Sequence, residues 1–115
     1  MTRRLLLLLS ITGALASPQS PAGDAKHGKE LFLSYACYSC HSFDGHGGAG
    51  ARLVPMPLNQ TAFIAFVRNA GRMPSYSSKA LPDTKLIDIY AYVKTLPASP
   101  DAKSIPLIQE LLKEN

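Results

Sequence analysis

The chain has no tryptophan and only two cysteines among its 115 residues, and both cysteines stand in one short motif. A disulfide framework and a four-cysteine zinc site are therefore excluded, because no thiol is left outside that motif. Lysine and arginine form no run and do not interleave with aromatic residues, so nothing supports nucleic-acid binding. Alternating apolar and polar residues, the pattern of a half-buried strand, are also missing over any useful length. These absences favour an all-α domain.

Long hydrophobic runs are absent as well. The apolar stretch from Leu5 to Ala16 is shorter than the roughly 20 residues that a membrane-spanning helix needs. Arg3 and Arg4 precede it and small residues close it, which is the pattern of a cleaved secretory signal. We therefore expect cleavage after Ala16 and a periplasmic mature protein. Losing the two arginines changes the count from 12 basic and 8 acidic residues to 10 and 8, so the net charge falls from +4 to +2.

The rest of the chain has the length of one small domain. We expect a signal peptide over 1–16, a flexible leader over 17–23, a folded domain over 24–97 and a C-terminal extension over 98–115. The domain should contain three main helices around one apolar core, and the extension a short helix folded back on the domain. The expected helices run from Asp24 (N-cap) to Tyr35, from Thr61 (N-cap) to Ala70 before Gly71, from Pro82 or Asp83 to Thr95, and from Ile105 to Lys113.

Cys37-Tyr38-Ser39-Cys40-His41 carries the chemistry. Two thiols at this spacing, with a histidine directly after the second, are typical of covalent c-type haem attachment. Each sulfur can form a thioether to one haem vinyl group, and His41 can bind the iron from that side. The alternatives are a redox dithiol, which needs a βαβ context, a zinc site that recruits His46 and His27, and an accidental match. The dithiol lacks that context, and the zinc site lacks the second paired-ligand element that such sites normally show.

Several residues compete for the position on the other haem face. The candidates are Met73, Met56, His46, His27 or no residue at all. Met73 is the best placed, because it lies in a loop between two expected helices that can carry it across the haem. Met56 is close after His41 and is expected to fill the core. A His/Met site has a raised reduction potential and suits electron transfer.

Between Asp24 and Pro97 the chain resembles a class I cytochrome c of the small bacterial kind. The resemblance rests on three signatures in order: Gly28-x-x-x-Phe32 before the cysteine motif, Val67-Arg68 leading to Arg72-Met73-Pro74, and Ile89-Tyr90-Ala91-Tyr92-Val93 near the end. It implies an all-α class I cytochrome c fold around one covalent haem c.

The resemblance also implies roles for single residues. Met73 is then the sixth iron ligand, and Gly28 allows the first and last helices to cross closely, with Phe32 and Tyr92 packed at that contact. Leu53 packs on the haem. The backbone carbonyl of Ala51, where the family has proline, accepts a hydrogen bond from the His41 ring and orients it.

The resulting interpretation is a periplasmic carrier of single electrons that exchanges them with redox proteins, meets membranes only through transient partner docking, and is not an enzyme. One alternative is a cytochrome subunit docked permanently on a periplasmic dehydrogenase, with the C-terminal extension as its attachment. Another is a haem-based gas or redox sensor with labile Met73 ligation. Surface lysines could ring the haem edge for an acidic partner, but we expect ordinary solvated lysines at Lys26, Lys29, Lys79 and Lys85.

Overall fold

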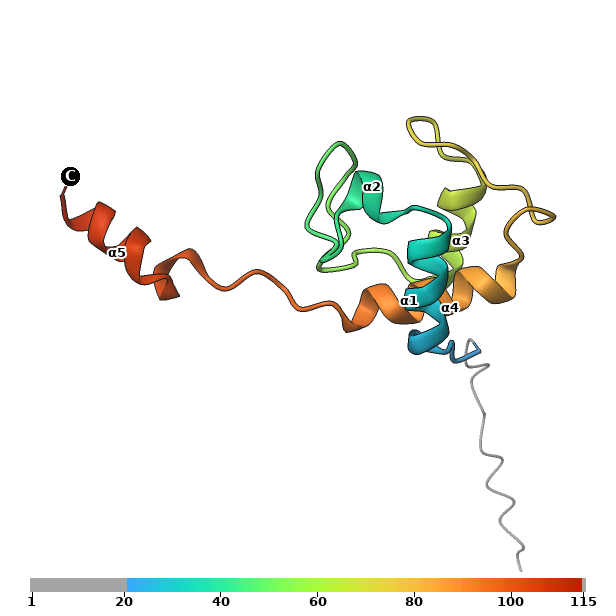
Figure 1. Ribbon diagram of the computed structural model, residues 1–115, viewed down its shortest axis with the longest axis horizontal. Coiled ribbons are helices and arrows are strands. Elements are labelled where there is room, and N and C mark those ends of the chain that lie inside the picture. The colour runs from blue at the N-terminus through green and yellow to red at the C-terminus, as the bar shows by residue number, and fades with distance from the viewer. Residues whose placement is uncertain (1–20, 115) are drawn as a thin grey trace, which may run out of the picture.

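The computed structural model describes residues 21–114, and within them the chain is all-α, as expected (Figure 1). The expected signal peptide, 1–16, and the first part of the leader lie outside the described residues. No strand occurs in the described part of the chain. The elements are α1 (Ala25–Ser34), α2 (Tyr38–His41), α3 (Gln60–Arg68), α4 (Asp83–Thr95), the 3-10 helix η1 (Ala102–Ser104) and α5 (Pro106–Lys113).

Helix α1 begins where the sequence predicts. The Asp24 carboxylate accepts hydrogen bonds from the backbone N–H groups of Lys26 and His27, which satisfies two amides that have no partner within the helix. The helix ends in a Schellman motif, in which the N–H of Cys37 bonds to the carbonyl of Phe32 at 3.0 Å. Ala36 takes the left-handed position of this motif, with φ +55°, although glycine is the usual residue there.

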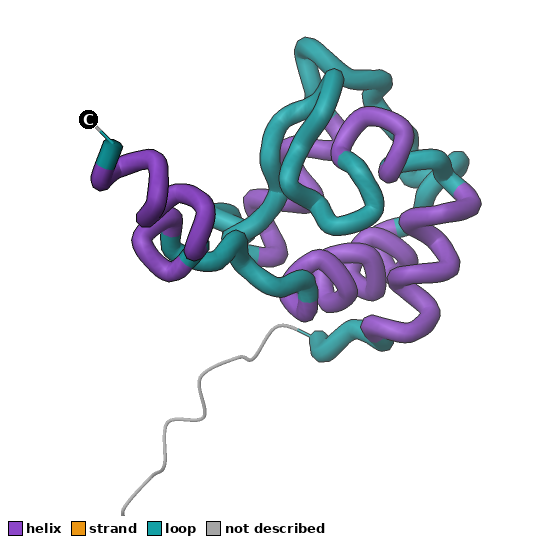
Figure 2. Tube along the Cα trace, turned by 60° about the vertical axis from the view of Figure 1, so that its left-hand side comes forward, coloured by secondary structure: helices purple, strands orange, loops and turns teal. Residues whose placement is uncertain are grey.

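Helices α1 and α4 cross closely and form the base of the domain (Figure 1, Figure 2). Gly28 makes this crossing possible: a Cβ atom there would lie 2.5 Å from the carbonyl carbon of Asp88 and 2.9 Å from the Cβ of Tyr92. The rings of Phe32 and Tyr92 meet edge to face at the same crossing, with centroids 5.5 Å apart. The expected roles of Gly28, Phe32 and Tyr92 are confirmed.

The Asp88 carboxylate joins the same two helices by hydrogen bonds at the surface of the domain. It accepts a hydrogen bond from the backbone N–H of Asp24 at 2.7 Å and another from the His27 ring at 2.8 Å. The Asp24 amide, followed by the His27 ring, holds the pKa of the Asp88 carboxyl below its usual value. A single charged side chain of α4 therefore fixes the first turn of α1.

Helix α3 differs from the prediction at both ends. Its N-cap is Asn59, whose side chain accepts from the N–H of Ala62, so the helix starts before Thr61. It ends at Arg68 with Asn69 as C-cap, and Gly71 takes no part in the stop. Asn and Thr are both good capping residues two positions apart, and local sequence does not choose between them. Helix α4 has the expected bounds, with Pro82 at its N-cap.

The core lies between α1, α3 and α4. Phe63 and Val67 of α3 face the crossing helices, and Leu81 closes the core from the loop before α4 with only 1% of its surface exposed. Helix α4 turns one apolar face toward this core. Its buried residues are Leu86, Ile89, Tyr92 and Val93, whereas Tyr90 and Leu96 are half-buried against the cluster.

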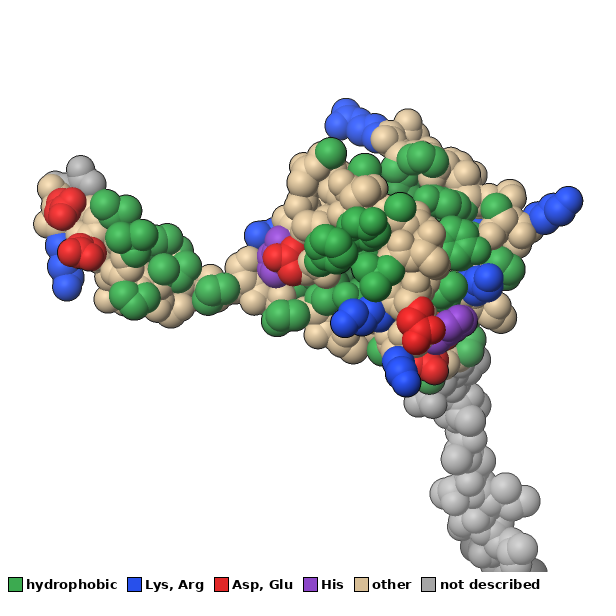
Figure 3. Space-filling view, in the orientation of Figure 1, with side chains coloured by type: hydrophobic (Ala, Val, Ile, Leu, Met, Phe, Trp, Pro, Cys, Tyr) green, Lys and Arg blue, Asp and Glu red, His purple; other side chains and the backbone are tan. Residues whose placement is uncertain are grey.

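The C-terminal extension does form a helix, but the expectation that it folds back is wrong. Helix α5 stands away from the domain and packs on η1 (Figure 1). Its apolar side chains gather along the helix in the space-filling view, and Leu107 and Leu112 stay 64% and 65% exposed (Figure 3). Apolar periodicity shows that one face of a helix is apolar but not which surface covers it, so it cannot predict where α5 packs. Among the described residues, none of the helices has the length and apolar character to cross a bilayer.

Candidate functional site

A cavity of about 310 Å³ opens beside the core, and its walls are almost wholly apolar. Core residues such as Phe32 and Val93 form its floor, whereas Leu53, Met56 and Met73 come from the loops around it. Phe66 of α3 also lines it, although 56% of its surface is exposed. A large apolar side chain turned out of the core into a cavity suits a large, flat, apolar ligand, because that ligand would cover it.

The cysteine motif forms the single turn of helix α2, and Cys37 and His41 line this cavity, whereas Cys40 is not among its lining residues. The Schellman motif places Cys37 directly after the end of α1, and the N–H of His41 then bonds to the Cys37 carbonyl at 3.1 Å. Cys37 and Cys40 are three residues apart on this turn and so share one side of it. Both thiols are free, and burial raises the pKa of Cys37. The sequence predicted the motif but not its helical turn.

The imidazole of His41 is held in one tautomer. Its Nδ1 lies 2.6 Å from the backbone carbonyl of Ala51, and since a carbonyl can only accept, Nδ1 carries the proton and donates. This confirms the expected contact, although alanine replaces the proline of the family. Nε2 keeps its lone pair as a donor to a metal ion, and His41 lines the cavity.

A glycine-rich turn brings Ala51 to His41. Gly45 and Gly47 have φ +72° and +97°, a backbone region that other residues rarely adopt, and they fold the 42–50 segment back on α2. The N–H of Gly50 then bonds to the carbonyl of Cys40 at 2.7 Å. A Cβ atom on Gly50 would lie 3.0 Å from Cε1 of His41, so the backbone passes directly against the ring.

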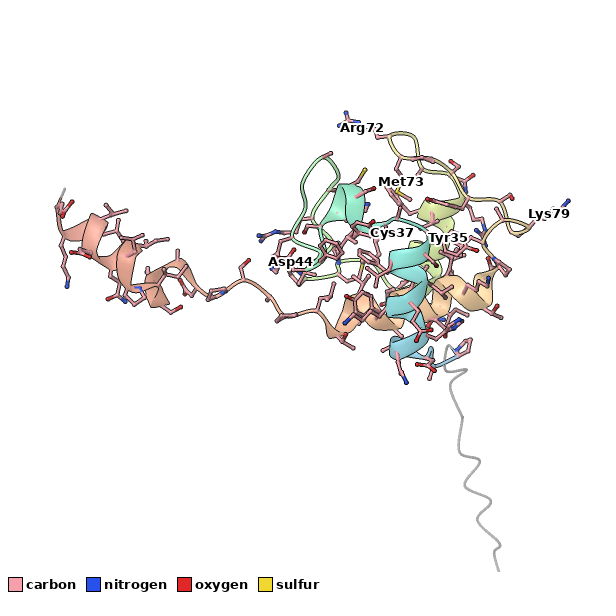
Figure 4. All side chains as sticks on the ribbon, in the orientation of Figure 1. Tyr35, Cys37, Asp44, Arg72, Met73 and Lys79 are labelled. Carbon is pink, nitrogen blue, oxygen red and sulfur yellow. The ribbon has the colours of Figure 1, made fainter. Side chains whose placement is uncertain are left out.

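The structure separates the candidates for the second axial ligand into two groups. Met73 and Met56 both line the cavity with His41, whereas neither His46 nor His27 is among the residues that line it. Met73 also lines a second, smaller cavity together with both thiols and His41, and Met56 does not. Met73 lies on the side of its loop that faces Cys37, while Arg72 points away from the domain (Figure 4).

The two histidines are engaged elsewhere. The His27 ring donates to Asp88 near the start of α1. Both ring nitrogens of His46 are buried although 20% of its side chain is exposed, and Nδ1 lies 3.2 Å from a carboxylate oxygen of Asp44, outside hydrogen-bond geometry. The Ser42 hydroxyl, followed by the backbone N–H of His46, lowers the pKa of Asp44 to about 2. Both histidines therefore belong to local surface structure.

Sequence reasoning missed Tyr76 and Phe66 as parts of the site. Tyr76 lines both cavities, its ring meets that of Tyr35 edge to face at 6.1 Å, and burial raises its pKa. Its position three residues after Met73 was the only available signal in the sequence. The loop has no regular secondary structure, so sequence spacing does not predict which way the Tyr76 side chain faces. Phe66 has no separate signal in the sequence, because apolar helical spacing does not distinguish a core from a ligand cavity.

The fold and the motif together define a cytochrome c domain. More narrowly, the family model described as cytochrome c oxidase, cbb3-type, subunit III matches residues 23–93, and the chain belongs to this family. The chain is 32% identical over 96 residues to the cytochrome bc1 complex cytochrome c subunit of Corynebacterium diphtheriae, covering 79% of this chain and 34% of the relative. The same subunit of Mycobacterium bovis is 33% identical over 87 residues, covering 71% and 31%.

The chain thus spans about a third of the length of these curated relatives. No solved structure matches it. Membership of the family establishes an electron-transfer domain that carries covalent haem c and is not an enzyme, as the sequence predicted. The spacing of Cys37 and Cys40 is consistent with that attachment.

Proposed function

We propose that the chain is a periplasmic carrier of single electrons in which Cys37 and Cys40 hold the haem by thioethers and His41 and Met73 bind its iron. The observation that carries the proposal is the shared apolar cavity, which Cys37, His41 and Met73 all line. The residues present fit the group: an apolar wall for the macrocycle, a histidine nitrogen with a free lone pair, and a thioether. The bound haem supplies reversible one-electron chemistry.

The protein's own contribution is to fix the ligands and exclude water. The Ala51 carbonyl, by accepting from Nδ1, keeps the His41 ring in one orientation and makes it a better ligand. Leu53, Phe66 and Leu86 line the cavity with apolar surface, so charge on a bound haem iron would be poorly solvated. A neutral thioether from Met73 would favour the reduced state and raise the potential.

Exchange of Met73 tests the ligand assignment. Met73→Ala should abolish the weak charge-transfer band that ferric haem shows with bound methionine sulfur, lower the reduction potential and let carbon monoxide bind the reduced protein readily. Met56→Ala is the matched control, since Met56 lines the same cavity, and it should keep the band. The proposal fails if Met56→Ala loses the band and Met73→Ala keeps it. Free binding of carbon monoxide to the wild type would favour a sensor instead.

Export and domain limits have their own test. The proposal includes a cleaved signal peptide over 1–16, a leader over 17–23, a cytochrome domain over 24–97 and an extension over 98–115; the family match over 23–93 supports the domain limits. The mass of the red protein from a periplasmic fraction should correspond to a chain that begins at Ser17. A red protein of full-length mass in the cytoplasmic fraction contradicts the export proposal.

Redox proteins are the proposed partners, because the curated relatives are named as cytochrome c subunits of bc1 complexes. The same names favour a second candidate, a subunit that stays attached to a respiratory complex, with α5 as its contact. Gel filtration of the native red protein decides between them. A monomer that reduces or oxidises several partners supports the free carrier, whereas elution only with a larger complex supports the subunit.

A further inference from the structure

The segment that carries Met73 has no regular structure of its own. Residues 69–82 connect α3 to α4 without a helix or strand. A loop of this kind holds a side chain over a cavity only if something else fixes its backbone. The contacts that fix the loop backbone therefore decide how firmly Met73 is held over the cavity.

The last residue of α3, Arg68, reaches across the base of this loop. Its Nη1 donates to the backbone carbonyl of Tyr76 at 2.8 Å, and its Nη2 donates to the carbonyl of Leu81 at 2.6 Å. Nη2 also forms an ion pair with the Asp83 carboxylate at the start of α4. The Arg68 side chain is only 17% exposed, so water competes weakly for these contacts.

The three acceptors lie at different places along the chain: Tyr76 is in the middle of the loop, Leu81 is close to its end, and Asp83 is the first residue of α4. A planar guanidinium can hold such a set because its five N–H donors point outward in a fixed plane. A lysine ammonium is a compact charge that cannot match the same spread of directions. Two of the acceptors are backbone carbonyls, so the side chains of Tyr76 and Leu81 play no part in these contacts.

Other contacts support the same segment at its ends. The N–H of Tyr76 bonds to the Val67 carbonyl at 3.2 Å, and the Tyr35 hydroxyl donates to the Ala80 carbonyl at 2.9 Å. The Ser75 hydroxyl donates to the carbonyl of Ala70 at 3.1 Å. The tip around Arg72 and Met73 lies beyond these bonds, so the position of Met73 follows the anchored base.

We infer that Arg68 is the positioning residue for the Met73 loop and sets how often Met73 leaves the cavity. The expected change in the rate of imidazole binding rests on the proposed role of Met73 as an iron ligand. The structural part of the inference, the anchoring of residues 70–82, stands on the hydrogen bonds alone. Arg68 touches neither thiol nor His41 in these contacts, and it acts through the loop.

The test compares the haem-loaded wild type with Arg68→Met, which keeps an apolar stem but no donor, and Arg68→Lys, which keeps the charge. Arg72→Met is the matched control, because Arg72 is the exposed arginine next to Met73. Amide hydrogen exchange is followed by mass spectrometry over 70–82 and over α1. The rate at which imidazole replaces the methionine ligand in the ferric protein is the second readout.

Arg68→Met should raise the exchange over 70–82 and the imidazole binding rate about tenfold, equivalent to about 1.4 kcal/mol. Exchange over α1 should stay as in the wild type, Arg68→Lys should fall in between, and Arg72→Met should change nothing. Unchanged exchange over 70–82, or an equal rise over α1, overturns the inference. If Arg68→Met does not fold, Arg68→Lys and Asp83→Asn make the same comparison with smaller changes expected.

The two proposals can fail separately. A wild type without the methionine charge-transfer band refutes the axial role of Met73, and the exchange arm then decides the Arg68 inference by itself. If the wild type shows the band and Arg68→Met leaves the exchange over 70–82 unchanged, the ligand role of Met73 stands and the inference about Arg68 is refuted.

Discussion

Replacing Gly28 by alanine should strongly destabilise the domain, because the added methyl group has nowhere to go. Its position lies 2.5 Å from the Asp88 carbonyl carbon and 2.9 Å from the Cβ of Tyr92, and closer still to the Asp88 carbonyl oxygen. Backbone cannot move aside as a flexible side chain does, so α1 and α4 must separate. Overpacking of this kind costs about 3 kcal/mol at the upper end of the usual range. Alanine regains about 1 kcal/mol through its better helix propensity.

The expected net loss is therefore about 2 kcal/mol, or a lowering of Tm by about 8–16 °C for a domain of this size. Urea unfolding of the haem-loaded protein, followed by far-ultraviolet circular dichroism, measures the loss of unfolding free energy. Gly71→Ala is the matched control: its added Cβ would meet no atom within 4 Å, and Gly71 lies outside the helices. Equal stability of Gly28→Ala and Gly71→Ala would refute the close crossing of α1 and α4.

Two further predictions concern the start and end of α1. Ala36→Gly should stabilise the domain by about 1 kcal/mol, since glycine adopts the left-handed φ of the Schellman position without strain; an unchanged urea midpoint would contradict this. The lowered pKa of Asp88 means that its carboxylate stabilises the fold above its unfolded pKa, about 3.9, and that this contribution is lost as the pH falls through the folded pKa. Asp88→Asn should therefore unfold at lower urea at pH 7 and lose less stability on acidification than the wild type; parallel pH profiles would rule out this linkage.

Predictions from local chemistry were the most reliable. Asp24 caps α1 because its carboxylate reaches only amides within the next turn, and no distant residue is needed. The bounds of α4 follow from Pro82 and from its apolar stripe. The failures arose where two local choices were nearly equal, as at Asn59 and Thr61, or where nothing local decided, as in the placement of α5.

The sequence by itself determined the haem motif, the helical fold and the short set of candidate ligands, because thiol spacing and helical periodicity are properties of consecutive residues. Only the tertiary structure showed that His46 and His27 are not among the residues that line the cavity, whereas Met73 and Met56 are. It also revealed Arg68, whose contacts to Tyr76 and Leu81 use backbone carbonyls that carry no sequence signal. Such contacts depend on how the loop folds over α3, and that path is fixed by packing across the whole domain.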